Sequence, residues 1–369
     1  MTDARALYLF SSNIRPLYEQ DVLNVLAAPA GLTYRFRYRK GYLSPELRDA
    51  WDNETLRGRA CIVHFSLQQP NQYHDAVLFP VRLGSVTRVT KEAGDIYLIE
   101  FTVDRSICLR QPDVPPTPDP AATAQAYRQR VDEYRAYLND RQVPVPYEAS
   151  ASLGPNVSSD TSAPVDVGEG EGHLFQRTTE FLAGTASYQN AKFYRILRLE
   201  RREGTTPPEV PFTPGVGYRV TSGKGYQVVV LHSQPRDITS RSAFVIAADQ
   251  NVAHVVGRQG FEMASKYDVA SIPMIATELT GAGAREGVLE ISPEPGVQGP
   301  SVTLPIRLEP EALKTTGAVG MSMLGLVLIG LTGIVATTQP QLAFAALIGG
   351  TALATLVPLI MTGRTPWSG

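Results

Sequence analysis

Between Lys314 and Arg364 the sequence contains no charged residue, and most of this segment is Leu, Ile, Val, Ala, Met and Gly. A helix needs about 20 apolar residues to cross the hydrocarbon core of a bilayer, so the segment is long enough for two crossings. A polar run at 337–341 lies where a tight turn would join the two helices. The sequence therefore predicts a transmembrane hairpin with helices at about 316–336 and 342–361. The alternative is a helical hairpin buried in a soluble core.

Flanking charges predict how this hairpin would be oriented. Lys314 and Arg364 lie outside the two helices, whereas the turn between them has no basic residue. The apolar patch at 6–10 is too short for the hydrophobic region of a signal peptide. The excess of Arg over Lys favours a GC-rich bacterial source. We therefore expect a multi-pass protein of the bacterial inner membrane, in contact with the lipid bilayer through two helices and with both termini in the cytoplasm.

The residues before the hairpin have the composition of ordinary globular domains. The formal net charge of −2 gives no overall bias toward nucleic acid or anionic lipid. Cys61 and Cys108 each lie in an apolar run, which indicates buried strand thiols rather than a disulfide or a metal site. Mixed helix and strand signals precede the proline-rich run at 112–118, and many short strand signals, beginning at 175–182, follow the Gly-rich run near 168–172.

These signals divide the chain into segments. The expected fold class is α+β and β-rich in the cytosolic region, where an α+β domain is followed by a β-sandwich-like domain, with a C-terminal two-helix transmembrane hairpin. The helix after the proline-rich run is amphipathic, with Tyr127, Val131, Tyr134 and Leu138 on one face. The segments are 1–110 (α+β cytosolic domain), 111–142 (Pro hinge and amphipathic helix), 143–171 (flexible linker), 172–312 (β-sandwich-like cytosolic domain) and 313–369 (transmembrane hairpin).

Catalytic and metal-binding patterns are absent from the sequence. The five histidines have no metal-ligand spacing, and His64 and His232 lie inside strand patterns as expected for the edge of a core. No nucleophile elbow or P-loop is present, because the run at 222–225 lacks the required flanking Gly and Ser or Thr. We therefore expect no enzyme activity, no catalytic residue, no metal and no cofactor.

The strongest local pattern lies at 34–40. Read as a strand, it places Tyr34, Phe36 and Tyr38 on one face and three arginines on the other. Guanidinium groups match phosphate oxygens bidentately, so this arrangement predicts a site for a phosphate-bearing ligand. The alternative is a strand whose arginine face is simply solvated or paired with carboxylates. The candidate ligand-binding residues are Arg35, Arg37, Arg39 and Lys40.

Small residues recur along both predicted membrane helices. Such residues allow helix backbones to approach closely in lipid. This pattern predicts a homo-oligomer whose hairpins line a pore, and the alternative is a passive anchor in which the two helices pack on each other. The candidate pore or helix-packing residues are Ser322, Gly325, Thr332, Ala346, Gly350 and Ala354.

A large cytosolic body joined to a minimal hairpin at 316–361 resembles the transmembrane effectors of bacterial antiphage defence, such as those of CBASS and Hailong systems. The resemblance lies in architecture. It implies an immune effector whose cytosolic domains sense a nucleotide or oligonucleotide signal made by a cognate protein. It further implies that the signal gates an oligomeric ion channel that disrupts the inner membrane.

Two other functions fit the same sequence. The first is a membrane-tethered scaffold or adaptor that binds a cytosolic protein partner through its α+β domain. The second is a hydrolase on a membrane anchor, which the missing nucleophile and base patterns disfavour.

Overall fold

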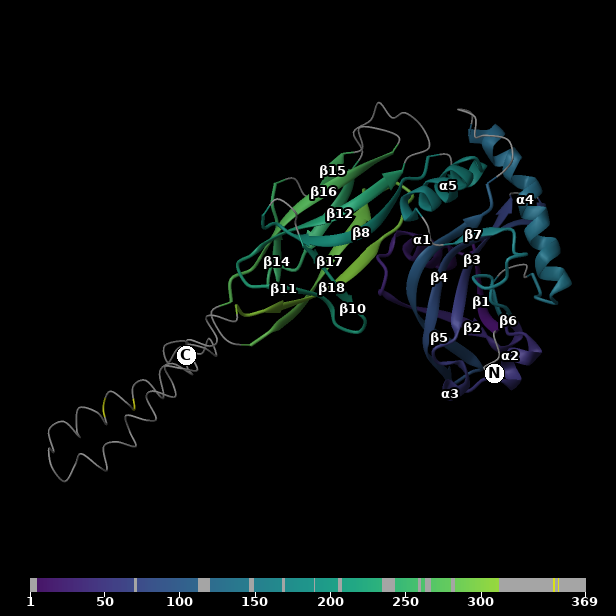
Figure 1. The fold of residues 1–369 in the computed structure, drawn as a ribbon, viewed down its shortest axis with the longest axis horizontal. Coiled ribbons are helices and arrows are strands. Elements are labelled where there is room, and N and C mark those ends of the chain that lie inside the picture. Colours follow the sequence, from purple (N-terminus) through teal and green to yellow (C-terminus); the bar gives the residue numbers. More distant parts are fainter. Residues whose placement is uncertain are drawn as a thin grey trace, which may run out of the picture.

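The computed structural model describes most of the chain before residue 312. Its described part consists of a curled sheet with flanking helices, and of a second body built from two further sheets (Figure 1). The described residues are 5–69, 72–111, 120–145, 149–167, 170–188, 190–204, 208–233, 243–257, 260–262, 267–279 and 283–311, together with 348 and 351.

The curled sheet has the strand order β2-β5-β4-β3-β1-β6. Its neighbours are antiparallel except for β1 and β3, which run parallel. A short strand, β7, pairs with the end of β5. The strands are β1 (Arg5–Ser12), β2 (Thr33–Arg39), β3 (Ala60–Gln69), β4 (Gln72–Glu92), β5 (Ile96–Leu109), β6 (Ser150–Pro155) and β7 (Val165–Val167).

Helices cover the two faces of this sheet. Helix α1 opens with Pro16 at its first position, where the missing amide hydrogen costs nothing, and it lies between the sheet and the second body (Figure 1). Helix α4 packs on the opposite face, where its buried residues include Tyr127, Val131, Tyr134 and Leu138. The helices are α1 (Pro16–Ala27), α2 (Pro45–Asp49), α3 (Asn53–Leu56), α4 (Pro120–Asp140) and α5 (Glu171–Ala183), with 3₁₀ turns at Lys40–Tyr42 and Ala186–Tyr188.

The sheet curls until the chain beyond one edge strand meets the other edge strand. After β2 the chain turns, and Leu43 forms a parallel bridge with Ala151 of β6. The amide of Ser44 donates to the carbonyl of Ala151 over 3.0 Å. We call this contact between residues 41–48 and the start of β6 the seam. The curl therefore brings the two edges of the sheet together at one end.

The second body contains two sheets that face each other. The hydroxyl of Tyr194 on β8 donates to the carbonyl of Ile291 on β17, and its ring packs edge-on against Phe244 of β13. The sheets have the orders β10-β11-β18-β17-β13-β15 and β14-β16-β12-β8-β9. Their strands are β8 (Phe193–Arg201), β9 (Glu209–Val210), β10 (Phe212–Thr213), β11 (Gly217–Thr221), β12 (Gly225–Ser233), β13 (Ala243–Ala248), β14 (Ala253–Val255), β15 (Gly260–Glu262), β16 (Tyr267–Ala276), β17 (Arg285–Pro293) and β18 (Val302–Glu309).

One hydrophobic core runs through both parts of the molecule. At their junction Glu19 of α1 accepts hydrogen bonds from the hydroxyl of Tyr188, over 2.5 Å, and from the amide of Gln298, over 2.8 Å. The side-chain oxygen of Asn24 accepts from the amide of Ser301 over 2.7 Å. The curled sheet and the two-sheet body are therefore packed as one unit around α1.

Several elements differ from the sequence-based expectation. Residues 175–182, expected as a strand, lie in helix α5, because Phe175, Thr178 and Leu182 recur at helical spacing on one buried face. Strands β6 and β7 form within 143–171, which was expected to be a linker. Strand β16 was missed altogether, since Pro273 interrupts its sequence.

The predicted membrane architecture is not supported. A crossing helix must hold about 20 apolar residues in continuous helical form, and no helix within the described ranges meets that requirement. The transmembrane hairpin in the expected fold class, the ion channel and the multi-pass inner-membrane localisation are therefore corrected. An uncharged apolar sequence indicates a preference for a non-aqueous environment but does not by itself establish a crossing. Apart from Ile348 and Thr351, residues 312–369 lie outside the described residues.

A substitution at Gly217 tests how closely β11 packs against β18. The φ of this glycine is +92°, and a Cβ at this position would lie 2.0 Å from the carbonyl oxygen of Pro305. Gly215 has a φ of +77° but open space around its Cβ position, so it supplies a matched control. We expect Gly217→Ala to lower the free energy of unfolding by about 2 kcal/mol more than Gly215→Ala does, because only the former adds a steric clash to backbone strain. Urea unfolding measures both changes, and equal losses would contradict the close approach.

Candidate functional site

The candidate site lies on β2, the edge strand of the curled sheet. The side chains of Thr33–Arg39 alternate in exposure, so Arg35, Arg37 and Arg39 are exposed while Phe36 and Tyr38 are buried. Pairing with β5 continues this outer face across the sheet, with Glu100 opposite Arg35 and Leu98 opposite Arg37. We call the exposed side of β2, with the adjoining parts of β5 and β4, the arginine face.

Charges on the arginine face are unevenly paired. The guanidinium of Arg35 donates to Glu100 through its Nε, over 2.9 Å, and through a second nitrogen. Arg88 of β4 lies opposite Glu100 on the other side of β5. Within the described residues, Arg37 and Arg39 have no hydrogen bond or ion pair through their guanidinium groups. Two arginines are therefore available to a ligand, while a third is fixed by a carboxylate.

The aromatic residues of β2 are not part of this face. Tyr38 and Phe36 are buried on the inner side, and the hydroxyl of Tyr38 donates to the carbonyl of Phe10 over 3.3 Å. Tyr34 donates in the same way to the carbonyl of Asn24 on α1 over 3.0 Å. Because these rings are held in the core, the face offers charge and hydrogen bonds rather than stacking to a ligand.

Two arginines lie buried on the inner side of the sheet, near the junction. Arg82 is fully buried and donates to the carbonyl of Asp104 over 2.5 Å, and Arg195 of β8 donates to the hydroxyl of Ser106. Burial lowers the pKa of Arg82 to about 10. Burial and then the charge of Arg82 lower the pKa of Arg195. Sequence reasoning missed this pair, because arginine in a strand is ordinarily an exposed residue.

His64 is a structural residue. It is fully buried between α4 and the sheet, where one ring nitrogen lies 2.7 Å from the hydroxyl of Tyr134 and the other lies 3.1 Å from the carbonyl of Ile62. Burial lowers the pKa of His64 to about 3, so the ring is neutral at physiological pH. An acid–base role near neutrality requires a pKa close to the working pH, and burial keeps the pKa of His64 well below that range. The part of the chain that the structure describes also contains no cluster of His, Cys, Asp or Glu suited to a metal ion.

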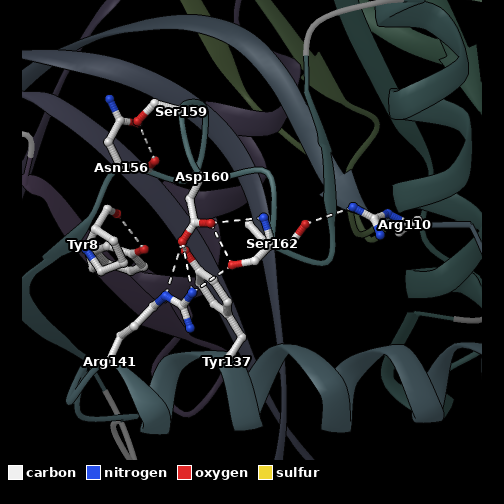
Figure 2. A network of polar contacts seen from close by, with 10 residues as sticks. Tyr8, Arg110, Tyr137, Arg141, Asn156, Ser159, Asp160 and Ser162 are labelled. Carbon is white, nitrogen blue, oxygen red and sulfur yellow. Dashed lines mark hydrogen bonds and ion pairs between the residues drawn. The ribbon is translucent and has the colours of Figure 1, made fainter.

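A polar network ties the loop after β6 to the end of α4 (Figure 2). The carboxylate of Asp160 accepts from the hydroxyl of Tyr137 over 2.9 Å, from Arg141 over 3.1 Å and from the amide of Ser162 over 2.9 Å. The guanidinium of Arg141 also lies 4.0 Å from the centre of the Tyr137 ring. Both carboxylate oxygens of Asp160 are thus engaged within the protein, which indicates a structural clamp rather than a ligand site.

The sequence-predicted site residues fall into two groups. Arg35, Arg37 and Arg39 lie together on β2, and Lys40 follows them at the start of the 3₁₀ turn. None of the six residues proposed for a pore or for helix packing is described, so these predictions lie outside the described residues: Ser322, Gly325, Thr332, Ala346, Gly350 and Ala354.

Comparison with known proteins identifies no relative. No family model matches the chain, and no curated protein matches it. A GH5 xyloglucanase from Bacteroides ovatus, solved with a XXXG heptasaccharide, is similar over 25% of this chain and 17% of that chain, with 6% identity and a TM-score of 0.18. The VesB protease of Vibrio cholerae is similar over 63% of this chain and 82% of that chain, with 6% identity and a TM-score of 0.17. Likenesses this low carry no argument about fold or function.

The Asp160 clamp predicts a specific dependence of stability on pH. Hydrogen bonds from Ser162 and then from Tyr137, with the charge of Arg141, lower the pKa of Asp160 from 3.8 to about 2. A carboxylate whose pKa falls on folding stabilises the folded state above its unfolded pKa, and this contribution disappears as the pH falls from 3.8 toward 2. The difference in free energy of unfolding between the wild type and Asp160→Asn should therefore be constant at neutral pH and shrink across that acid range.

Urea unfolding at a series of pH values measures this difference. Asp132→Asn supplies the control, because Asp132 is exposed on α4 and has no partner within the described residues. If the free energy of unfolding changed with pH in the same way in Asp160→Asn and in Asp132→Asn, the clamp would be contradicted.

Proposed function

We propose that this protein binds a phosphorylated ligand, a nucleotide or an oligonucleotide signal, on the arginine face of β2. The observation that carries the proposal is the exposure of Arg37 and Arg39 side by side, neither engaged by a carboxylate within the described residues. Arginine matches phosphate oxygens with two parallel hydrogen bonds, which makes such a pair a suitable receptor for phosphate groups.

The geometry of the strand supports more than one phosphate contact. Alternate residues of a strand lie about 6.6 Å apart, so the backbone of β2 places Arg37 and Arg39 where both can reach the phosphates of one ligand. The buried aromatic face of β2 holds their backbone in place, which lowers the entropy lost when a ligand binds. Lys40 extends the positive charge beyond the end of the strand.

Binding fits this face better than catalysis does. Its described side chains include the carboxylates Glu92 and Glu100 but no His or Cys. Glu100 is engaged by Arg35. The face therefore offers no evident nucleophile with an adjacent base, and we propose recognition without turnover. The cognate signal-producing protein, homo-oligomer formation and the resemblance to antiphage effectors remain predictions from the sequence.

A double variant tests the proposal. Arg37→Glu/Arg39→Glu should weaken binding of a fluorescein-labelled short oligonucleotide by at least about tenfold, because it replaces two attractive phosphate interactions with repulsion. It should also flatten the dependence of log affinity on log salt concentration by roughly one for each arginine–phosphate pair removed. Fluorescence anisotropy at several salt concentrations measures both quantities.

The control double variant is Arg128→Glu/Arg285→Glu. It changes the net charge equally, on exposed residues of α4 and β17 that lie outside the arginine face. An equal loss of affinity in the control would show that only net charge matters and would contradict the site.

A second candidate function is an adaptor that binds a protein partner, and one observation favours it. Val269 and Ile275 lie on the same face of β16 and are 52% and 47% exposed. Ser271 is exposed between them and Pro273 is half-buried, so this strand presents two apolar side chains and one polar side chain to its surroundings. Exposed apolar side chains that gather on one strand are a feature of protein-binding surfaces.

Matched variants distinguish the two functions. If the chain is an adaptor, a protein partner retained by the wild type should be lost from Val269→Ser/Ile275→Ser and kept by Arg37→Glu/Arg39→Glu. If the arginine face binds the ligand, the oligonucleotide should be lost from Arg37→Glu/Arg39→Glu and kept by Val269→Ser/Ile275→Ser. Affinity purification followed by mass spectrometry measures retention of the protein partner, and fluorescence anisotropy measures binding of the oligonucleotide. Retention of the protein partner by both double variants would exclude β16 as the docking strand.

A further inference from the structure

A cavity of about 580 Å³ lies at the seam, beyond the end of the arginine face. One wall consists of residues 41–45 and Arg48, and the other consists of Pro144 and residues 149–151. Pockets that bind small molecules in proteins have volumes of roughly 300–1,000 Å³, so the seam cavity has a suitable size. The curl of the sheet creates it, because each wall comes from a different edge of that sheet.

The lining of the cavity is mostly apolar. Leu43, Pro45, Pro144 and two alanines contribute hydrocarbon surface, and Tyr42 adds an aromatic ring. Proline and backbone-paired residues make up most of both walls, so the cavity is preformed rather than assembled from long flexible side chains. Such a lining favours a ligand with an apolar or aromatic body.

Besides Tyr42, three residues with polar side chains line the same cavity, and the side chain of Arg48 is available to a ligand. The hydroxyl of Ser44 is already engaged, since it caps α2 by accepting from the amide of Leu47 over 3.3 Å. The hydroxyl oxygen of Ser150 has less than 1 Å² of accessible surface, so a ligand in the cavity does not reach it. Arg48 is exposed, and its guanidinium has no ion pair or hydrogen bond within the described residues.

A guanidinium at the rim would attract an anionic group. We propose that the seam cavity binds a small anion with an apolar body, a phosphate monoester or a carboxylate. Its body contacts Tyr42 and Pro144, and its charged group pairs with Arg48.

Titration calorimetry of the full chain tests this site with four probes. Phenyl phosphate and benzoate combine an aromatic body with an anionic head, whereas phenol supplies an aromatic body alone and inorganic phosphate supplies an anionic head alone. At least one of the two complete probes should bind about tenfold or more tightly than either part. The tighter of the two identifies the head group that Arg48 selects. Complete probes that bind no better than their parts would overturn the proposal.

Two pairs of variants locate the binding. Gly41→Leu should abolish it by filling the cavity, because a Cβ at Gly41 meets open space and its φ lies outside the left-handed region. Gly283→Leu is the control, since Gly283 is equally open but lies before β17. Arg48→Ala should weaken binding by about tenfold, while Arg57→Ala, which removes another exposed arginine outside the lining, should leave it unchanged.

The outcomes separate the seam cavity from the arginine face. Unchanged binding in both Gly41→Leu and Arg48→Ala would overturn the cavity site whatever the arginine face does. Loss of probe binding in Arg37→Glu/Arg39→Glu but not in Arg48→Ala would assign the anion to the arginine face instead. Thermal unfolding of each variant confirms that its fold is intact.

Discussion

Burial of the aromatic side of β2 sets the register and the curl of the first sheet. Phe36 and Tyr38 can be buried only if β2 pairs with β5 in the observed register, since a slip by one residue would bury the arginines. The Tyr38 hydroxyl reaches the carbonyl of Phe10 on β1, across the concave side. The same packing thus turns Arg37 and Arg39 outward and directs the following residues toward the seam.

Helix α1 joins this sheet to the two-sheet body. It presents Val22, Val25 and Leu26 to the core, while Glu19 and Asn24 accept hydrogen bonds from the second body. Tyr34 of β2 donates to the same helix. A ligand at the arginine face therefore binds to a strand whose inner side is tied, through one helix, to the body that follows. This connection offers a physical route between ligand binding and the remainder of the chain.

The sequence predicted an element correctly where its apolar residues recur with a clear strand or helix period. It failed where tertiary packing determines the secondary structure or the burial of a residue. The alternation in β2 and the helical face of α4 are both visible in the sequence, and both elements are present. Helix α5 was mistaken for a strand because Thr178 and Thr179 favour strands, whereas burial of Phe175 and Leu182 selects the helix. Arg82 and Arg307 follow similar tripeptides, yet the first is fully buried and the second is partly exposed. The seam cavity joins residues about a hundred positions apart, which no local pattern could reveal.

Arginine footprinting can show whether the outer side of β2 recognises phosphate. Phenylglyoxal modification of the full chain, read by mass spectrometry with and without a short oligonucleotide, reports the accessibility of each guanidinium. We expect the oligonucleotide to protect Arg37 and Arg39 and to leave Arg128 and Arg285 reactive. Equal reactivity of Arg37 and Arg39 in the two samples, at an oligonucleotide concentration that saturates binding, would contradict this expectation.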